Sequence, residues 1–327
     1  MIFVHGAASD ASTWFYRTDP NLDVIGTQYA MEGFDVWYAN LRGSIPSRSH
    51  ELASFDPDGE FEFQRAAYWD FDYNDMAEQD IQAVIEKVIQ VNGDCKKATL
   101  IGHSLGATVI PNALSKSSRA RKYVQASINM GPCFIPDGNS FAPGLEISNA
   151  RLDLIEGAFD FFNIESLFGP NWDTDLGTIC TLGLPFGFGD VCTTLTDIEL
   201  YSESSPFGAK EIGTKLVKHL IQNINNQDYH RIDASTTPSA VLSDIKGVPV
   251  RFMFATGDMV CPQADQQRFV DAAVATTKRR PTFTFEGRDH FFFAGANDAE
   301  FKSELDRMLR KEDKDITEKA CRRPFKW

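Results

Sequence analysis

Residues 102–106 read Gly-His-Ser-Leu-Gly and lie between a predicted strand and a predicted helix. The strand is the short apolar run 97–101, which polar residues bound on both sides, as is typical of a buried strand. The helix continues from Ala107, although Pro111 should kink it or end it early. Glycines on both sides of a serine let the chain turn sharply and hold the serine in a strained position above the sheet. This context favours a nucleophilic Ser104 over a chance surface turn, because the helix N-terminus also stabilises nearby negative charge.

A serine nucleophile needs a base, and the base needs a partner that orients it. In this architecture the chain order is serine, then a carboxylate, then histidine. Three histidines follow Ser104, namely His219, His230 and His290. His219 lies in a run with helical spacing and His230 in a polar stretch, so we expect a structural position and a solvated loop, respectively. His290 follows a predicted strand at 281–285 and precedes a predicted C-terminal helix, so we predict His290 as the base.

The acid is expected just beyond a strand, at the edge of a parallel sheet where ligands bind. Residues 248–255 form a predicted strand, and Asp258 lies in the turn that follows it. Asp265 and Asp271 are expected on a helix surface. Asp289 is a rival because it adjoins the predicted base, but neighbouring side chains in a loop seldom point at each other. We therefore predict that Asp258 orients the imidazole.

An oxyanion hole completes such a site, and two backbone amides supply it. One amide comes from the residue after the nucleophile, which is Leu105. The other comes from the loop after an earlier strand, and here residues 1–4 form a predicted strand that His5-Gly6-Ala7-Ala8 follow. We therefore predict the amides of Ala7 and Leu105 as the donors. Each donor lowers the barrier by about 3 kcal/mol in comparable sites.

Beyond these residues, the chain resembles the acid lipases, the family that includes gastric lipase and lysosomal acid lipase. The segments that carry the resemblance are Gly33–Trp37, Asn40–Ser44, Ser47–His50, Tyr68–Phe71, Asp75–Asp80, Ser205–Gly208, Gly257-Asp258 and Asp289–Phe293. The resemblance implies hydrolysis of neutral lipid esters, triacylglycerol or steryl ester, through an acyl-enzyme on Ser104 at a lipid–water interface. Family members usually carry glutamine where this chain has Leu105, a difference that a backbone donor tolerates.

The resemblance also implies an α/β-hydrolase fold, a mostly parallel sheet flanked by helices with an inserted cap. We expect the core at 1–130 and 247–327 and the cap at 131–246, where glycine, proline and aromatic residues replace the alternating pattern. The N-terminal strands and the secretion signal of the family are not recognisable, and a fragment is the expected reason. By resemblance, the protein is expected to be secreted or lysosomal.

Two features of the cap remain open to interpretation. The apolar segment 159–168 is either ordinary cap core or the wall of an acyl-chain tunnel beneath a lid. The resemblance implies a disulfide between Cys180 and Cys192, which flank a glycine-rich stretch. The pairing of the other cysteines stays undecided; these are Cys95, Cys133, Cys261 and Cys321.

Composition excludes several other classes of function. The chain carries 32 basic and 46 acidic side chains, a net charge of −14, which argues against a nucleic-acid partner. No apolar run is long enough for a transmembrane segment. No cysteines have the close paired spacing of a zinc site, and we predict neither a metal nor a cofactor. A carboxylesterase for short soluble esters and a non-catalytic binding protein of the same fold remain the alternatives.

Overall fold

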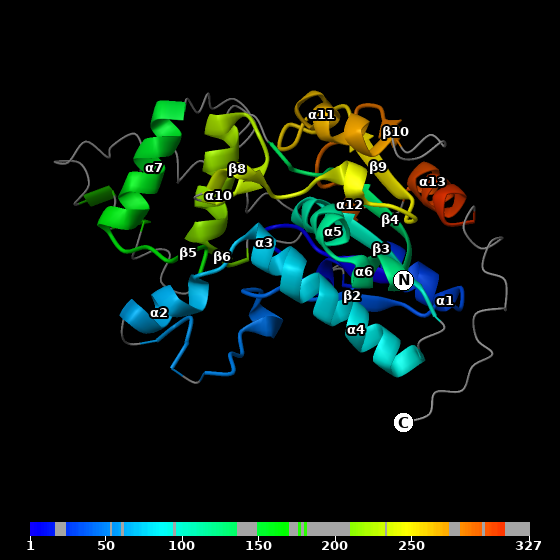
Figure 1. Ribbon diagram of the computed structural model, residues 1–327, viewed down its shortest axis with the longest axis horizontal. Helices are drawn as coiled ribbons and strands as arrows, with labels where there is room; N and C mark the ends of the chain where they lie inside the picture. The colour runs from blue at the N-terminus through cyan, green and yellow to red at the C-terminus, as the bar shows by residue number, and fades with distance from the viewer. Residues whose placement is uncertain are drawn as a thin grey trace.

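The computed structural model describes residues 1–16, 24–52, 54–59, 62–93, 96–135, 149–169, 176–177, 180–181, 210–232, 234–274, 282–295 and 298–310. A six-stranded sheet lies at its centre (Figure 1). In spatial order the strands are β10 (Thr282–Phe285), β9 (Val250–Ala255), β4 (Val124–Met130), β3 (Ala98–His103), β1 (Ile2–Val4) and β2 (Trp37–Ala39). All neighbouring pairs are parallel, so the carboxyl ends of the six strands meet at one edge.

Both faces of this sheet are buried because alternate residues of each strand point to opposite sides. Ile2 and Val4 contribute to one apolar core, which the helices α4 (Ile81–Asn92), α5 (Leu105–Lys116) and α11 (Gln263–Val274) cover. Phe3 contributes to the other core, which α1 (Ile25–Met31) and α13 (Ala299–Arg310) cover. This arrangement confirms the expected parallel sheet flanked by helices.

The remaining elements are shorter. They are the 3-10 turns η1 (Ala11–Trp14), η2 (Ile45–Ser47) and η6 (Leu242–Asp244), and the helices α2 (Glu62–Trp69), α3 (Tyr73–Asp75), α6 (Ser118–Tyr123), α7 (Asn149–Phe161), α10 (Thr214–Asn226) and α12 (Phe292–Gly295), with a π-helical turn η3 (Met76–Asp80). Two small antiparallel ladders pair β5 (Ser166–Leu167) with β6 (Ile212–Gly213) and β7 (His230–Arg231) with β8 (Ala234–Pro238). Among the helices of the described part, none is long and apolar enough to cross a bilayer.

Of the two outcomes expected at Pro111, an early end of helix α5 does not occur, because the helix continues to Lys116. A proline inside a helix costs about 3 kcal/mol locally. However, every residue of α5 from Leu105 to Ser115 is buried. We infer that packing of this helix against β3 and β4 outweighs the local penalty.

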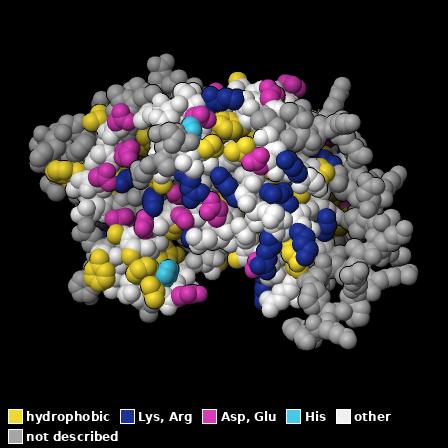
Figure 2. Space-filling view, viewed as in Figure 1, with side chains coloured by type: hydrophobic (Ala, Val, Ile, Leu, Met, Phe, Trp, Pro, Cys, Tyr) yellow, Lys and Arg dark blue, Asp and Glu magenta, His cyan; other side chains and the backbone are white. Residues whose placement is uncertain are grey.

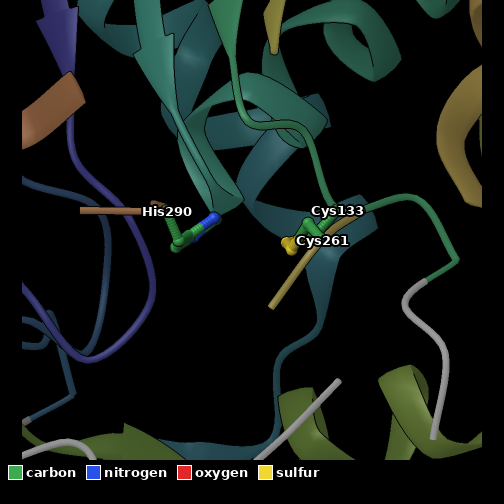
Figure 3. A group of neighbouring side chains, drawn as sticks. All are labelled: Cys133, Cys261 and His290. Atoms are coloured by element: carbon green, nitrogen blue, oxygen red, sulfur yellow. A yellow bond between two sulfur atoms is a disulfide. The ribbon is translucent and has the colours of Figure 1, made fainter. Parts of the chain in front are cut away.

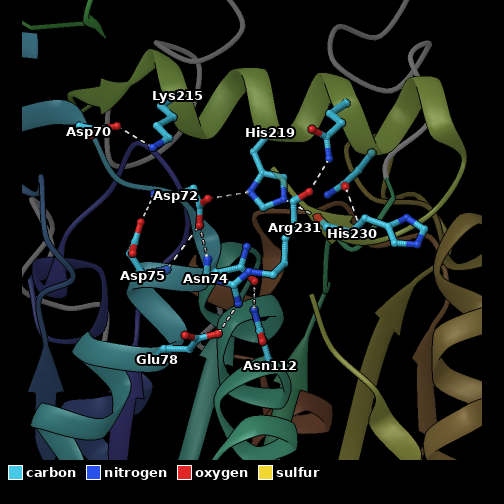
Figure 4. A network of polar contacts seen from close by, with 12 residues as sticks. Asp70, Asp72, Asn74, Asp75, Glu78, Asn112, Lys215, His219, His230 and Arg231 are labelled. Atoms are coloured by element: carbon cyan, nitrogen blue, oxygen red, sulfur yellow. Dashed lines mark hydrogen bonds and ion pairs between the residues drawn. The ribbon is translucent and has the colours of Figure 1, made fainter. Parts of the chain in front are cut away.

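The elements α7, β5, β6 and α10 lie outside the sheet, at the upper left of Figure 1. Polar contacts join α10 to the segment before α3 (Figure 4). The ammonium of Lys215 lies 2.6 Å from the Asp70 carboxylate. The buried ring of His219 stacks on Tyr73 with centroids 4.8 Å apart, and its Nε2 donates to the carbonyl of His230 at 2.6 Å. His219 therefore has the structural role expected of it.

His230 differs from the solvated loop that its polar neighbours predicted. It begins β7, where it pairs with Pro238 of β8. Its side chain is largely buried, 16% exposed. This short ladder lies against α10, where the carbonyl of His230 accepts a hydrogen bond from the ring of His219.

Candidate active site

Ser104 lies in the turn between β3 and α5, with φ 53° and ψ −116°. A positive φ is rare for a residue with a side chain, and such strained backbone is the mark of a nucleophile elbow. Two glycines make the turn possible. A Cβ on Gly102 would lie 2.5 Å from the backbone of Gly106, and a Cβ on Gly106 would lie 2.5 Å from the carbonyl oxygen of Val4. The sequence therefore folds into the predicted turn, and the serine is 8% exposed.

Asp258 and His290 meet at the same edge of the sheet. Asp258 follows β9 and is 4% exposed, and its Oδ2 lies 2.8 Å from Nδ1 of His290. Because a carboxylate only accepts, Nδ1 carries the proton, and Nε2 is left with a free lone pair. Burial raises the pKa of Asp258, but the charge of His290, the hydrogen bond to its ring and the Cys261 amide outweigh burial. The net result is a pKa below its usual value, so this carboxyl stays ionised.

Asp289, the rival acid, points elsewhere. It is exposed, and its Oδ1 accepts from the amide of Phe292 at the start of α12, at 2.9 Å. Asp265 and Asp271 lie on α11. Of the four carboxylates considered, only Asp258 is hydrogen-bonded to His290 within the described residues.

Shared neighbours place Ser104 and His290 together. A Cβ on Gly131 would lie 3.3 Å from Nδ1 of His290, and Gly131 follows the strand residue whose carbonyl accepts the Ser104 amide at 2.9 Å. The Sγ of Cys133 lies 3.9 Å from Oγ of Ser104 and within 4.8 Å of a ring nitrogen of His290. The serine and the histidine thus flank one sulfur atom. The structure brings all three predicted side chains to one place.

The predicted oxyanion donors line one cleft beside the serine. Leu105 is the first residue of α5, so its amide has no partner within the helix. Ala7 is exposed in the loop after β1, and Ala8 beside it has φ 47°. A Cβ on Gly6 would lie 3.1 Å from Cβ of Ser104, a tight contact, so glycine lets this loop approach the nucleophile.

Sequence reasoning missed the side chain that holds this loop, which is His5. Its Nε2 accepts from the amide of Leu41 at 3.1 Å, so its Nδ1 carries the proton and donates to the carbonyl of Gly6 at 2.7 Å. Burial lowers the pKa of His5, which favours this neutral form. A histidine directly after a buried strand and before glycine is the signal that could have indicated it.

A second buried histidine, His103, lies behind the base. Its Nε2 donates to the carbonyl of His290 at 2.8 Å, and the two ring centroids are 4.8 Å apart. Burial, followed by the nearby His290, lowers the pKa of His103 to about 3. His103 therefore stays neutral and adds no positive charge beside the base.

The cleft is partly open to solvent. Its walls combine the loop after β1 with apolar side chains of the core and residues of the outer elements. The lining includes Ala7, Leu105, Trp69, Phe71, Met76, Ile212 and Leu216. The lining also includes the polar residues Arg42, Ser44 and Glu211.

One buried carboxylate that sequence reasoning missed, Glu211, also lines the cleft. It forms an ion pair with Arg48 and accepts from Oγ of Ser166, 2.6 Å away. Burial raises the pKa of Glu211 more than these partners lower it. These contacts tie the segment after β2 to β5.

The structure also gives the pairing of two of the cysteines that the sequence left undecided. Cys133 and Cys261 form a disulfide beside His290 (Figure 3). Within the described residues they and His290 form the one group spaced for a metal ion, but the two sulfurs are bonded to each other. Cys180 is disulfide-bonded, whereas Cys192, its expected partner, lies outside the described residues, as do Cys95 and Cys321.

Comparisons with known proteins identify the family and the fold. A model of the alpha/beta hydrolase family matches residues 1–302. Lysosomal acid lipase/cholesteryl ester hydrolase of Rattus norvegicus is 27% identical over 253 residues, which are 70% of this chain and 56% of that protein. Lipase member M of Mus musculus is 37% identical over 109 residues, 33% of this chain and 23% of that protein. The resemblance to the acid lipases is thereby confirmed, although the chain spans only about half of these relatives or less.

A solved structure shows the same fold. The monoacylglycerol lipase of Paleococcus ferrophilus superposes with a TM-score of 0.53 at 16% identity, over 95% of this chain and 91% of that chain. At this identity the likeness bears on the fold alone. Because the family match extends over nearly all of the described residues, the chain belongs to the alpha/beta hydrolase family.

Proposed function

We propose that this chain is a serine ester hydrolase that cleaves neutral lipid esters, triacylglycerol or steryl esters. The observation that carries the proposal is the hydrogen bond between Asp258 and His290 behind the strained turn of Ser104. A histidine whose Nδ1 is held by a buried carboxylate has its Nε2 available as a general base. The likeness to lysosomal acid lipase supports the choice of substrate.

The proposed reaction passes through an acyl-enzyme. His290 Nε2 takes the proton of the Ser104 hydroxyl as its Oγ attacks the ester carbonyl, while Asp258 stabilises the imidazolium. The amides of Ala7 and Leu105 stabilise the negative oxygen of the tetrahedral intermediate. His290 then gives its proton to the departing alcohol. Water, activated by the same ring, releases the fatty acid from Ser104.

We further propose that residues 131–246 act as the cap over this site. The described part of this region separates its apolar residues into two sets. Phe159, Ile164 and Leu167 are buried in a small cluster of their own, as the cap-core interpretation expects. Phe161 is 56% exposed and Leu154, seven residues earlier on α7, is 42% exposed. Residues seven apart share one face of a helix, and this face supports contact with a lipid surface.

A second apolar region supports an interfacial substrate. Hydrophobic side chains gather over α2, at the lower left of Figure 2. Phe63 of α2 is 63% exposed, and Leu52, in the loop before it, is 55% exposed. Trp69 at the end of the same helix lines the cleft. A surface that continues into the cleft would let an insoluble ester enter from an interface.

By the same likeness, we propose a secreted or lysosomal location. The Cys133–Cys261 disulfide supports an oxidising compartment, since such bonds are rare in the cytosol. The expected Cys180–Cys192 bridge of the cap remains part of the proposal.

The alternative function is a carboxylesterase for short soluble esters. The burial of Phe159, Ile164 and Leu167 favours it, because these side chains fill the cap rather than line the cleft.

Esters of increasing acyl length separate the two functions. Each additional buried CH₂ contributes about 0.8 kcal/mol, so kcat/KM should rise steadily from C4 to C12 and should rise again where substrate exceeds its solubility. Phe161→Ser should lower hydrolysis of emulsions by about tenfold and leave a soluble C4 ester unchanged, whereas Phe15→Ser, an exposed phenylalanine on the core, serves as the matched control. A profile that is flat beyond C4, with no response to an interface, would assign the chain to the carboxylesterases.

A further inference from the structure

We propose that the Cys133–Cys261 disulfide is a positioning element of the active site, which holds the turn of Asp258 against the elbow of Ser104. The inference rests on the proposed function and assigns a further role at the same site. The proposed role affects the rate of the chemical step, because Cys261 contacts the proposed acid and Cys133 contacts the proposed nucleophile.

The bridge joins the ends of two neighbouring strands. Cys133 lies three residues beyond β4 and Cys261 six residues beyond β9, and these strands are hydrogen-bonded neighbours. The two cysteines are separated by 128 residues in sequence, and their Cα atoms are 5.2 Å apart. The disulfide therefore closes the carboxyl edge of the sheet where the predicted catalytic side chains meet.

One half of the bridge holds the acid. The amide of Cys261 donates to Oδ1 of Asp258 at 2.7 Å, and the amide of Val260 donates to the same oxygen at 3.0 Å. The other carboxylate oxygen, Oδ2, accepts from His290. The backbone of the disulfide cysteine thus sets the orientation of the carboxylate, which in turn sets the imidazole. A shift of Cys261 would move both.

The other half holds the nucleophile. The amide of Cys133 donates to Oγ1 of Thr108 at 2.9 Å, and this hydroxyl donates to the carbonyl of Ser104 at 3.2 Å. The Sγ of Cys133 also lies 3.9 Å from Oγ of Ser104. Cys133 is therefore anchored to the first turn of α5. Through the sulfur–sulfur bond, the acid turn and the nucleophile turn become one unit.

Loss of the bridge should therefore change the rate constant more than substrate binding. A misplacement of about 1 Å in a catalytic group can cost about 100-fold in rate. For Cys133→Ala/Cys261→Ala we expect kcat 10- to 100-fold lower, with KM within about twofold of wild type, because the cleft walls do not include either cysteine.

A double-mutant cycle separates positioning from simple stabilisation. If the bridge acts through Asp258, its removal in an Asp258→Asn background should lower kcat less than about threefold, because the oriented carboxylate is already gone. An equal loss in both backgrounds, or an unchanged kcat in the bridge-free enzyme, would overturn the inference. If wild-type enzyme hydrolyses no ester, the proposed function fails instead, and the two failures remain distinguishable.

Reduction of the folded wild-type enzyme gives a second measurement should the double variant not fold. A trialkylphosphine breaks the sulfur–sulfur bond, water supplies an oxygen to the phosphine and two protons to the sulfurs, and the products are a phosphine oxide and two thiols. EDTA in every assay prevents metal ions from binding the freed thiols beside His290. Activity should fall at least tenfold while near-UV circular dichroism persists, and should return on reoxidation. Full activity with both thiols shown free by mass would contradict the proposal.

Discussion

Replacing Ser104 with alanine should lower kcat for ester hydrolysis by about 10⁶-fold without unfolding the protein. Removing the nucleophile of a serine triad costs this much in comparable enzymes. The change deletes one oxygen from a residue that is 8% exposed. Alanine keeps the Cβ that serine already has on this strained turn, so it adds no new steric contact. The measurement is steady-state hydrolysis of a soluble ester, with near-UV circular dichroism to show that the fold persists.

Ser115→Ala is the matched control, because Ser115 lies in the same helix and donates to the carbonyl of Asn112 rather than to a substrate. It should keep kcat within about threefold. His290→Ala should resemble the Ser104 variant, since the unassisted hydroxyl is a weak nucleophile. Substantial activity in Ser104→Ala would rule out the proposed acyl-enzyme.

Asp258→Asn should lower kcat by about 10⁴-fold, the loss seen when the orienting carboxylate of a triad becomes an amide. The amide nitrogen would face Nδ1 of His290 and favour the tautomer whose proton sits on Nε2, which cannot then act as a base. The same substitution at the exposed Asp289, which accepts from the nearby Phe292 amide, is the control and should change kcat by less than about threefold.

Comparison of these two variants decides which carboxylate orients the base. A larger loss in Asp289→Asn than in Asp258→Asn would show that the hydrogen bond to the ring is not the catalytic one. The lowered pKa of Asp258 also has a consequence for the pH dependence of activity. Because its carboxyl stays ionised down to and below its usual value of 3.8, this group should not limit activity in mildly acidic solution.

The positions of the proposed nucleophile, base and acid could be predicted because each follows a strand in a fixed chain order. Ser104, Asp258 and His290 all lie in short turns at one edge of the sheet, so the order of the strands along the chain suffices to place them. The role of His5 could not be predicted from the order of the strands. Its role depends on the amide of Leu41, which comes from a different strand end.

The pairing of Cys133 with Cys261 needed the spatial order of strands rather than their order in sequence. The cysteines are 128 residues apart, and they meet because β4 and β9 are neighbours in the sheet. The path of α5 through Pro111 likewise depends on burial, which local propensity does not contain. By contrast, the difference between buried Phe159 and exposed Phe161 follows from helical spacing, because residues two positions apart point to opposite sides of a helix.

The central claim is that Oγ of Ser104 is the atom that becomes acylated. Incubation with a long-chain alkyl phosphonate, followed by intact-mass measurement and peptide mapping, tests this claim. The account predicts one adduct per chain, on the peptide that contains residues 102–106 and at Ser104, with loss of esterase activity in proportion to labelling. An adduct at a different residue, or full esterase activity in protein that is completely labelled at Ser104, would contradict it.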